Sequence, residues 1–442
     1  MTAFEIALAS VLAMLLLIYL GMHVAIVLAL VSFIGVWIIR GDLDVAVFHL
    51  WAAASQSISD SVFAVVPLYI LMGSLAGVAG MGRDTYDLAH RLIGRVRGSL
   101  GIATVIANAI FAAVTGVSVA SASIFAKLSV PEMMRHGYRA QFAVGVVAGS
   151  SILGMLIPPS VLMIVYGIIA EQSIGDLFIA GIGPGIAIVL TFAAMILVMA
   201  YRFPSLVMES GSFESEARAV RESDVPLWQQ AGPVAILVIS VMGGIYTGIF
   251  TPIEAAAVGS LIALIVAMAK RALTWKSFGQ VLLETGNVSA VVLFMIVGAS
   301  MYSRMLGVSG LPTQIGSVIT EMNASYAVLI AIYIAIVLAL GTLIDSVSIM
   351  LIMVPLFSVI LAPYNVDMIW FGIVTILAAE IGLLTPPFGL SVFVVHSTLA
   401  RADIPLKTVF IGSSYFAVAM FVVLMVLVAF PQLATYLVHI RY

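Results

Sequence analysis

The sequence contains no cysteine, and only 9% of its 442 residues are charged. The absence of cysteine excludes a disulfide framework and a thiolate metal site. The sequence also lacks the Gly-x-x-x-x-Gly-Lys-[Ser/Thr] loop of P-loop nucleotide hydrolysis and the His-Glu-x-x-His pattern of zinc peptidases. A formal net charge of −3 gives no indication of nucleic-acid binding. These absences argue against P-loop ATPases, zinc peptidases and nucleic-acid-binding proteins.

Hydrophobic residues make up 63% of the chain, and the mean hydropathy is +1.22. Apolar runs of around twenty residues can cross a bilayer as α-helices. The N-terminal run continues directly into further apolar sequence, so we expect a retained span and not a cleaved signal. The sequence therefore predicts an all-α polytopic membrane protein. The expected uninterrupted spans are Phe4–Leu20, Met22–Ile39, Val62–Gly80, Phe178–Tyr201, Trp228–Phe250, Glu254–Ala269, Val288–Leu306 and Val409–Phe430.

Two proline pairs interrupt apolar runs at matching places. Gly154-Met-Leu-Ile-Pro-Pro-Ser160 lies in the run Phe142–Ala170, and Gly382-Leu-Leu-Thr-Pro-Pro-Phe388 lies in the run Met368–Ser397. The glycine and the prolines recur at the same offset of 228 residues. Consecutive prolines remove two backbone donors and hold the preceding residue out of helical geometry. One pair could simply kink a packing helix, but the matched pairs predict two broken transmembrane helices, which are typical of an inverted-repeat secondary transporter.

Two other apolar runs each contain a short segment of small and hydroxyl residues. The run that begins with Ile102–Val114 stops at Thr115–Ser123 and is then followed by basic residues. The run Ala327–Leu361 has a similar segment at Gly341–Ser348. We expect each to be a re-entrant hairpin with this segment at its tip. The alternative is an ordinary packed helix, because small residues are common where transmembrane helices contact each other.

The distribution of lysine and arginine sets the expected orientation, because basic loops are enriched in the cytoplasm. The segment Arg83–Arg97 reads as a basic surface helix and is placed inside. Fifteen of the eighteen Lys and Arg residues then lie inside, and both chain termini lie outside. Span, hairpin, broken helix and span follow each other twice with opposite orientation. We therefore expect inverted repeats at 1–201 and 228–442, joined by a cytoplasmic connector at 202–227. The three basic residues left outside are Arg40, Arg304 and Arg441.

Each hairpin tip is expected to meet a broken helix and form a cation site. Freed backbone groups are tolerated in a membrane only where protein or a water-filled cavity surrounds them, and their carbonyl oxygens can coordinate a cation. Oxygen ligands without imidazole or thiolate favour sodium or a proton over a transition metal. One site would join Thr115, Gly116 and Ser118 with Gly154, Ile157 and Pro158; the other would join Gly341, Thr342 and Asp345 with Gly382, Thr385 and Pro386.

Three charged residues in apolar surroundings have competing interpretations. Intramembrane carboxylates usually mark ion or proton pathways, and Asp345 at a tip is the stronger candidate. Asp345 could instead cap the returning helix, and Glu380 could belong to a packed polar contact. Arg304 could extend to the membrane interface or attract an anionic substrate.

An enzyme and a channel are the rival classes. Gly307-Val-Ser-Gly310 matches the Gly-x-Ser-Gly pattern of intramembrane serine proteases, with His396 as a conceivable base. The pattern is short in a chain with 37 glycines, and the expected topology puts Ser309 and His396 near opposite faces. Two sites in inverted halves favour alternating access over a channel.

Four stretches carry a resemblance to a known family: Ser129–Tyr138, Gly154–Ser160, Tyr246–Gly259 and Glu380–Leu390. They resemble the large membrane subunit of TRAP transporters, the tripartite ATP-independent periplasmic carriers. They follow the family's order over most of the chain. The chain differs at both tips, where it has Gly116-Val-Ser118 and Asp345-Ser-Val347 in place of the frequent Gly-Ser-Ala and Asp-Pro-Thr.

The resemblance implies a multi-pass protein of a bacterial inner membrane that imports an organic acid by sodium symport. It implies a small four-helix membrane subunit and a periplasmic substrate-binding protein as partners, and Na⁺ as the coupling ion. A moving transport domain would carry the hairpins and broken helices in an elevator-type cycle, and Arg83–Arg97 would be an interfacial arm or a membrane anchor. Dicarboxylates, sialic acids and other carboxylates remain open as substrates. A proton-coupled carrier of a related family is the alternative.

Overall fold

The computed structural model describes residues 2–93, 96–209, 226–311, 314, 325–399 and 404–441. Within these ranges the chain is built from helices, and its β-structure is limited to one isolated bridge between Tyr138 and Met208. Seven of the described helices are long and apolar enough to cross a membrane, or eight if the bent pair Ala140–Leu156 and Val161–Ile169 is one span. The predicted all-α polytopic class is confirmed.

The first half of the chain contains twelve named α-helices in the described ranges. They are α1 (Ala3–Tyr19), α2 (Val24–Arg40), α3 (Leu43–Ser59), α4 (Val65–Val78), α5 (Met81–Ile93), α6 (Ser99–Thr115), α7 (Ser118–Arg135), α8 (Ala140–Ser151), α9 (Leu153–Leu156), α10 (Val161–Ile169), α11 (Ile174–Arg202) and α12 (Pro204–Val207).

The second half begins with α13, which passes through a π-helical turn at Ile239–Gly243 before α14. Its helices are α13 (Leu227–Val238), α14 (Gly244–Tyr246), α15 (Pro252–Ala269), α16 (Trp275–Ser309), α18 (Tyr326–Gly341), α19 (Ser346–Leu361), α20 (Met368–Gly382), α21 (Leu390–Leu399), α22 (Leu406–Ala429) and α23 (Gln432–Arg441).

Local capping explains where many helices begin. Thr2 and Glu5 form a reciprocal capping box at α1, and Thr251 and Glu254 form another at α15, where Pro252 occupies the first turn. The Asp42 carboxylate accepts from two backbone amides at the start of α3. These caps satisfy amides that have no partner inside the helix.

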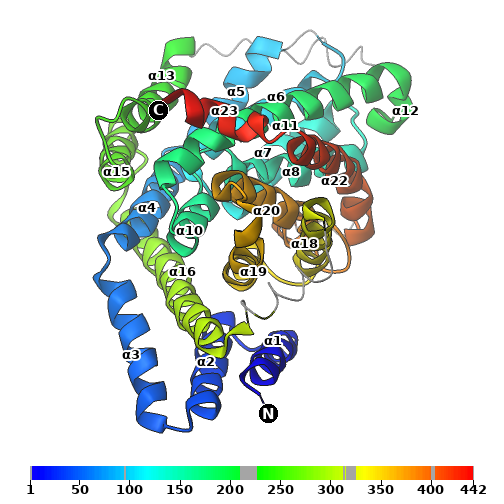
Figure 1. Cartoon of the computed structure of the whole chain (residues 1–442). Helices are drawn as coiled ribbons and strands as arrows, with labels where there is room; N and C mark the ends of the chain where they lie inside the picture. Colours follow the sequence, from blue (N-terminus) through cyan, green and yellow to red (C-terminus); the bar gives the residue numbers. More distant parts are fainter. Residues whose placement is uncertain are drawn as a thin grey trace.

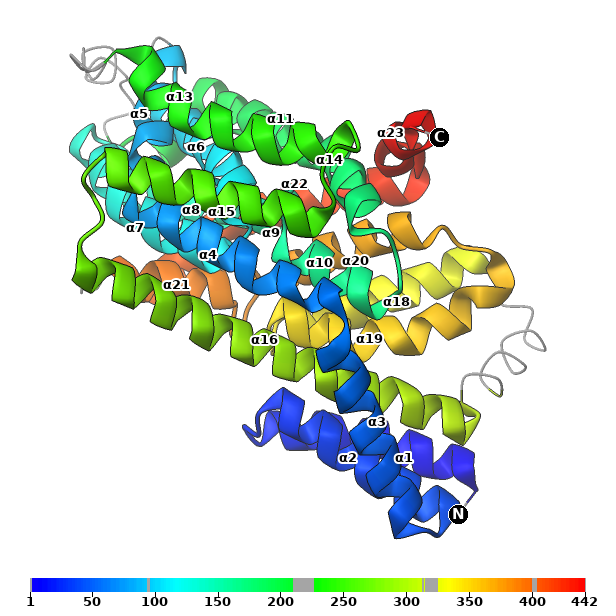
Figure 2. The ribbon, with the colours of Figure 1, turned by 90° about the vertical axis from the view of Figure 1, so that its left-hand side faces the viewer.

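The helices form two packed groups. In one group α16 packs along α2, α3 and α4, and α15 packs on α4 (Figures 1 and 2). Figure 2 shows α16 running diagonally across the molecule, with α1 and α2 on one side of it and α3 crossing it. In the other group α22 packs on α8, α7 packs on α8, and α18 packs on α20. We refer to the first set (α1–α4 and α13–α16) as the outer group and to the second (α6–α11 and α18–α22) as the inner group.

The two halves of the chain interlock within the inner group. Helix α10, which follows the first proline pair, packs on α19 and α20; helix α21, which follows the second, packs on α7 and α8. The Tyr166 hydroxyl on α10 donates to the carbonyl oxygen of Met368 at 2.5 Å. The Thr398 hydroxyl on α21 lies 3.5 Å from the Ser123 hydroxyl on α7. Each broken helix therefore contacts the hairpin of the other half.

Four elements differ from the sequence-based expectations. Helices α3 and α23 were not predicted. The sequence of α3 is not a continuous apolar run, because it contains polar side chains such as Asp44 and Gln56, and α23 is short and mixes polar with apolar residues. The predicted span Val288–Leu306 is the C-terminal part of α16, whose 35 residues would extend roughly 52 Å at 1.5 Å per residue. Because this exceeds a hydrocarbon core of about 30 Å, α16 must tilt or project from the membrane.

The fourth difference concerns the basic segment Arg83–Arg97, of which Arg95 lies outside the described residues. Helix α5 forms its first part, but it is not a free surface helix, because one face packs on α6 and α13. Tyr86 of α5 is 6% exposed, and burial raises the pKa of its phenol above the ordinary value, with a smaller contribution from Glu132 of α7.

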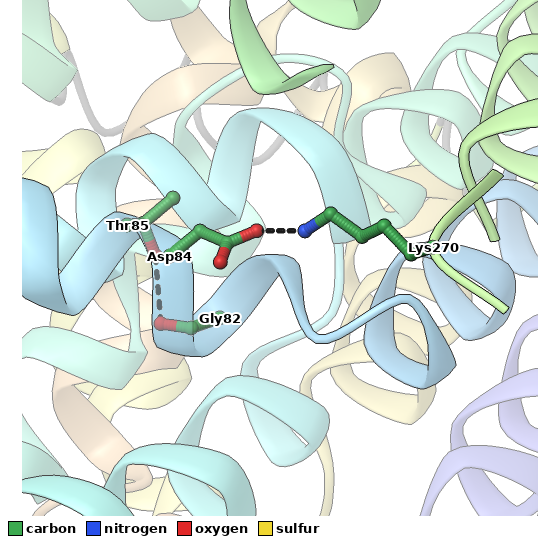
Figure 3. A network of polar contacts seen from close by, with 4 residues as sticks. All are labelled: Gly82, Asp84, Thr85 and Lys270. Carbon is green, nitrogen blue, oxygen red and sulfur yellow. Dashed lines mark hydrogen bonds and ion pairs between the residues drawn. The ribbon is translucent and has the colours of Figure 1, made fainter. Parts of the chain in front are cut away.

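An ion pair joins α5 to the C-terminal end of α15. The Lys270 ammonium contacts the Asp84 carboxylate, and the neighbouring Thr85 hydroxyl donates to the Gly82 carbonyl at 2.9 Å (Figure 3). Asp84 and Lys270 are 186 residues apart, so the contact links the two halves of the chain.

Most of the predicted connector 202–227 lies outside the described residues, as do Arg401 and Tyr442. The described residues 202–209 include the short helix α12, and after it the Glu209 amide donates to the Gly137 carbonyl at 2.9 Å. The repeat boundaries at 201 and 228 and the membrane orientation stay predictions.

Candidate functional site

The first helix break lies where the sequence predicted it. Helix α9 ends at Leu156 and α10 begins at Val161, and the two helical stretches are bent by 42°. Ile157 is extended (φ −82°, ψ 124°), as expected for a residue before proline, and the Pro158–Pro159 bond is cis. The Ser160 hydroxyl accepts from the Met163 amide at 3.4 Å and so caps the new helix.

The first hairpin tip touches this break through its backbone. Gly116 ends α6 in the left-handed region (φ +63°), and its carbonyl accepts from the Val161 amide at 3.2 Å. A Cβ at Gly116 would lie 2.6 Å from the Pro159 carbonyl oxygen, and one at Gly154 would lie 2.9 Å from the Val117 carbonyl carbon. Only glycine permits these approaches. We call this contact the first junction.

The six residues predicted for the first site are not all equivalent. Ser118 meets Gly154 through its backbone, and Gly116 meets Pro159. The Thr115 hydroxyl donates back to the Phe111 carbonyl at 3.1 Å. Ile157 and Pro158, in contrast, line an apolar cavity of about 480 Å³ together with residues of α6, α11 and α13. Their side chains therefore cannot be ligands, and only their backbone oxygens remain candidates.

The second junction joins the tip between α18 and α19 to the break after α20. A Cβ at Gly341 would lie 2.8 Å from the Gly382 Cα, and one at Gly382 would lie 2.5 Å from the Gly341 Cα. The Thr342 carbonyl accepts from the Phe388 amide at 3.2 Å, and the Pro386–Pro387 bond is cis. The structure thus brings the predicted tip and break together here as well.

The second break is longer and more exposed than the first. Residues 383–389 separate α20 from α21, against 157–160 in the first break. The Thr385 amide donates to the Gly382 carbonyl at 2.9 Å, and its hydroxyl donates to the Ile381 carbonyl at 3.0 Å. Pro386 is exposed, whereas Pro158 is buried. The rest of the chain therefore covers the second break less completely than the first.

Asp345 has the contacts of a helix cap. Its Oδ2 accepts from the Ser348 amide at 3.0 Å, and its Oδ1 accepts from the Ser348 hydroxyl. Asp345 directly precedes α19, so its carboxylate satisfies the first turn of the returning helix. The capping interpretation is therefore met geometrically, and a contribution to cation binding stays a prediction.

A polar contact of equal sequence spacing lies behind each junction. The Asn108 amide on α6 donates to the Ser150 hydroxyl on α8 at 2.7 Å. The Tyr333 hydroxyl on α18 lies 2.7 Å from the Thr375 hydroxyl on α20. Both pairs are 42 residues apart, and both tie the first arm of a hairpin to the broken helix that follows.

Sequence reasoning missed these residues and left Glu380 undecided. Asn108 and Ser150 are 0% exposed, as is Glu380, whose Oε1 accepts from the Ser346 hydroxyl at 2.7 Å. The available signal was a polar residue inside an apolar run. Without knowledge of the helix packing, that signal does not identify the partner, which lies 34 residues away for Glu380 and 42 residues away for Asn108.

The other candidates lie in separate contacts. The Arg304 guanidinium donates to the Gln56 side chain of α3, within the outer group. The Ser309 hydroxyl donates to the Leu306 carbonyl at 2.7 Å and accepts from the Leu311 amide at 3.1 Å, which makes it a local helix-end contact. Within the described ranges, no group of three or more His, Cys, Asp or Glu residues could hold a metal ion.

A cavity of about 690 Å³ lies between the outer and inner groups. The loop after α10 contributes Glu171 and Gln172, and the segments before α4 and α15 contribute Asp60 and Thr251. The cavity is thus bounded by both groups, at the ends of α4, α10 and α15. Elsewhere on α4, a Cβ at Gly73 would lie 2.8 Å from the Thr115 carbonyl oxygen, so α4 also packs directly on the first tip.

The same fold occurs in a solved transporter. The crystal structure of the YdaH transporter from Alcanivorax borkumensis matches with a TM-score of 0.64, covering 89% of this chain and 91% of that one. The sequences are 12% identical, so the likeness concerns the fold alone.

Sequence comparison gives the family. Residues 11–433 match the family described as tripartite ATP-independent periplasmic transporter, DctM component. The sialic acid TRAP transporter large permease protein SiaM of Vibrio cholerae is 32% identical over 83% of this chain and 84% of its own. The C4-dicarboxylate large permease DctM of Pseudomonas aeruginosa is 34% identical (77% and 78%), and the ectoine/5-hydroxyectoine large permease UehC of Ruegeria pomeroyi is 30% identical (96% and 97%). The chain therefore belongs to the DctM family of large permeases of TRAP transporters, and it is a multi-pass protein of the inner membrane.

Proposed function

We propose that this chain is the large permease of a sodium-coupled secondary transporter that imports an organic acid. The observation that carries the proposal is the repeated junction. At each one a tip carbonyl, of Gly116 or Thr342, accepts from a backbone amide that follows the proline pair. Backbone oxygens gathered at an interrupted helix are the ligands that many secondary transporters use for small cations. Such oxygens suit a hard cation.

The organisation of the chain supports two inverted repeats at 1–201 and 228–442. The polar contacts behind the junctions have the same spacing, and α10 and α21 each pack on the hairpin of the opposite half. Repeats of this kind place two related sites at their interface.

The proposed substrate class and partners rest on the relatives. Sialic acid, C4-dicarboxylate and ectoine are the solutes in their names, and each carries a carboxyl group. We therefore propose a carboxylate delivered by a periplasmic substrate-binding protein. A small four-helix membrane subunit would complete the permease, covering apolar side chains that are exposed on α1–α3, such as Leu12, Phe48 and Trp51.

An elevator-type movement fits the division into two groups. Both junctions lie in the inner group, which would move as the transport domain against the outer group as scaffold. The cavity of about 690 Å³ leaves part of the interface between them open, at the ends of α4, α10 and α15. Gly73, where α4 meets the first tip, has no side chain that would obstruct the sliding of one group past the other.

Reconstitution tests the proposal. The permease, its small subunit and its binding protein with a labelled carboxylate are combined in vesicles without ATP. An inward sodium gradient should drive accumulation, and replacing sodium with choline should abolish it. A requirement for ATP would contradict secondary transport, whereas accumulation driven by an inward proton gradient in choline would establish the proton-coupled alternative.

A further inference from the structure

Glu380 is a buried carboxylate whose role is explained neither by helix capping nor by the residues predicted to bind a cation. It lies on α20, two residues before Gly382, and is 0% exposed. Oε1 accepts from the Ser346 hydroxyl at 2.7 Å. Oε2 is buried and has no hydrogen-bond partner among the described residues. A carboxylate that stays ionised in apolar surroundings is costly unless it is paired, so in the ionised form this second oxygen needs a further partner.

The position of Ser346 connects Glu380 to the second junction. Ser346 is the first residue of α19 and directly follows Asp345. The bond between Ser346 and Glu380 therefore ties the returning arm of the hairpin to the broken helix, next to the close approach of Gly341 and Gly382. The two carboxylates at this tip differ, because both oxygens of Asp345 hold Ser348 while Glu380 retains a free oxygen.

The polar contacts behind the first junction are neutral, and the residue 228 positions before Glu380 is the uncharged Ile152. The Ser121 hydroxyl on α7 donates to Asn108 Oδ1 at 2.5 Å, and Asn108 Nδ2 donates to Ser150 at 2.7 Å. This chain of contacts ties the hairpin to the broken helix without a charge and leaves neither amide atom of Asn108 without a partner. The two junctions therefore differ in electrostatics although they share backbone geometry.

We propose that Glu380 is an additional residue of the second cation site, and that it supplies a buried negative charge to that site. Ser346 positions the carboxylate, and Oε2 faces the cation carried between the Gly341–Asp345 tip and the Gly382–Pro386 break. This inference rests on the proposed sodium coupling. It follows that the second site binds sodium more tightly than the neutral first site, because an opposite charge within a few ångströms in a region of low dielectric favours the bound ion.

The test measures the thermal stability of the purified permease complex as a function of sodium concentration, with choline keeping the ionic strength constant. Glu380→Gln keeps the size and an oxygen for Ser346 but removes the charge. It should raise the sodium concentration of half-maximal stabilisation by about tenfold or more, while the melting temperature in choline alone stays equal or rises. Glu284→Gln, an exposed position on α16, is the matched control and should leave the sodium response unchanged.

The outcomes separate this inference from the proposed function. A wild-type complex that sodium does not stabilise would refute the sodium coupling and this inference with it. A wild-type sodium response that Glu380→Gln retains would refute the role of Glu380 alone. Equal destabilisation of Glu380→Gln in sodium and choline would show a purely structural residue. If Glu380→Gln does not fold, Ser346→Ala is measured instead, because it keeps the Glu380 charge but removes the hydrogen bond that positions it. A sodium concentration of half-maximal stabilisation equal to that of the wild type would then overturn the proposal.

Discussion

Gly382→Ala should weaken sodium activation by pushing the second junction apart. The new Cβ would lie 2.5 Å from the Gly341 Cα and 3.0 Å from the Leu338 carbonyl oxygen. Ordinary contact begins near 3.4 Å, so α18 and α20 must separate by about 0.9 Å at this point. The obstacle is backbone and cannot rotate away, in contrast to a flexible side chain.

The expected magnitude follows from the cost of overpacking. Inserting a methyl group into a packed contact typically costs about 1–3 kcal/mol. If the cation stabilises the closed junction, this cost appears as a rise of roughly fivefold to 150-fold in the sodium concentration of half-maximal uptake. The assay is sodium-dependent uptake by vesicles that contain the permease and its partners, together with the melting temperature in choline.

Gly286→Ala is the matched control, because a Cβ at that position of α16 meets no atom within 4 Å. It should leave both sodium activation and stability near the wild-type values. The reasoning is refuted if Gly382→Ala has a wild-type sodium half-saturation, or if it lowers the melting temperature without any change in sodium dependence. Either result would mean that the close glycine contact serves packing and not the cation site.

Three other predictions test separate parts of the account. Asp345→Asn keeps a side chain that can cap α19 but removes the charge, so normal expression with weakened sodium activation is expected; unchanged activation would leave Asp345 a cap only. Asp84→Asn breaks the partly exposed ion pair with Lys270 and should cost about 0–1 kcal/mol of stability in a thermal melt, since such pairs contribute little; a much larger loss would contradict this. A membrane-impermeant thiol reagent applied from outside should label a single cysteine introduced at Tyr442 and should not label one introduced at Ser215; the opposite pattern would invert the topology.

The sequence predicted the junctions well because their causes are local. Proline has a fixed φ and no amide hydrogen, so the first break could be placed at Ile157 without knowledge of the fold. The tip at Gly116 could be found in the same way, because a left-handed residue favours glycine. The offset of 228 residues between the two breaks then indicated a pair of sites.

Other features of the structure could not be predicted from the sequence, because they depend on packing between segments that are distant along the chain. Helix α3 has too many polar residues to resemble a span, yet it packs on α2 and α16. The partners of Asn108 and Glu380 lie on neighbouring helices, and a polar residue in an apolar run does not reveal which helix will face it. Ile157 and Pro158 were assigned to the cation site, although their side chains line an apolar cavity on the other side of the break.

The most direct test of the central claim is to locate the coupling ion. A structure of the complete transporter determined in saturating sodium, and again in choline, should show ion density at both junctions in sodium only. At the first junction the expected ligands are backbone oxygens near Gly116 and Gly154; at the second they are oxygens near Thr342 and Gly382, with Glu380 adjacent. Junctions that are identical in the two conditions, together with sodium bound elsewhere in the chain, would contradict the account.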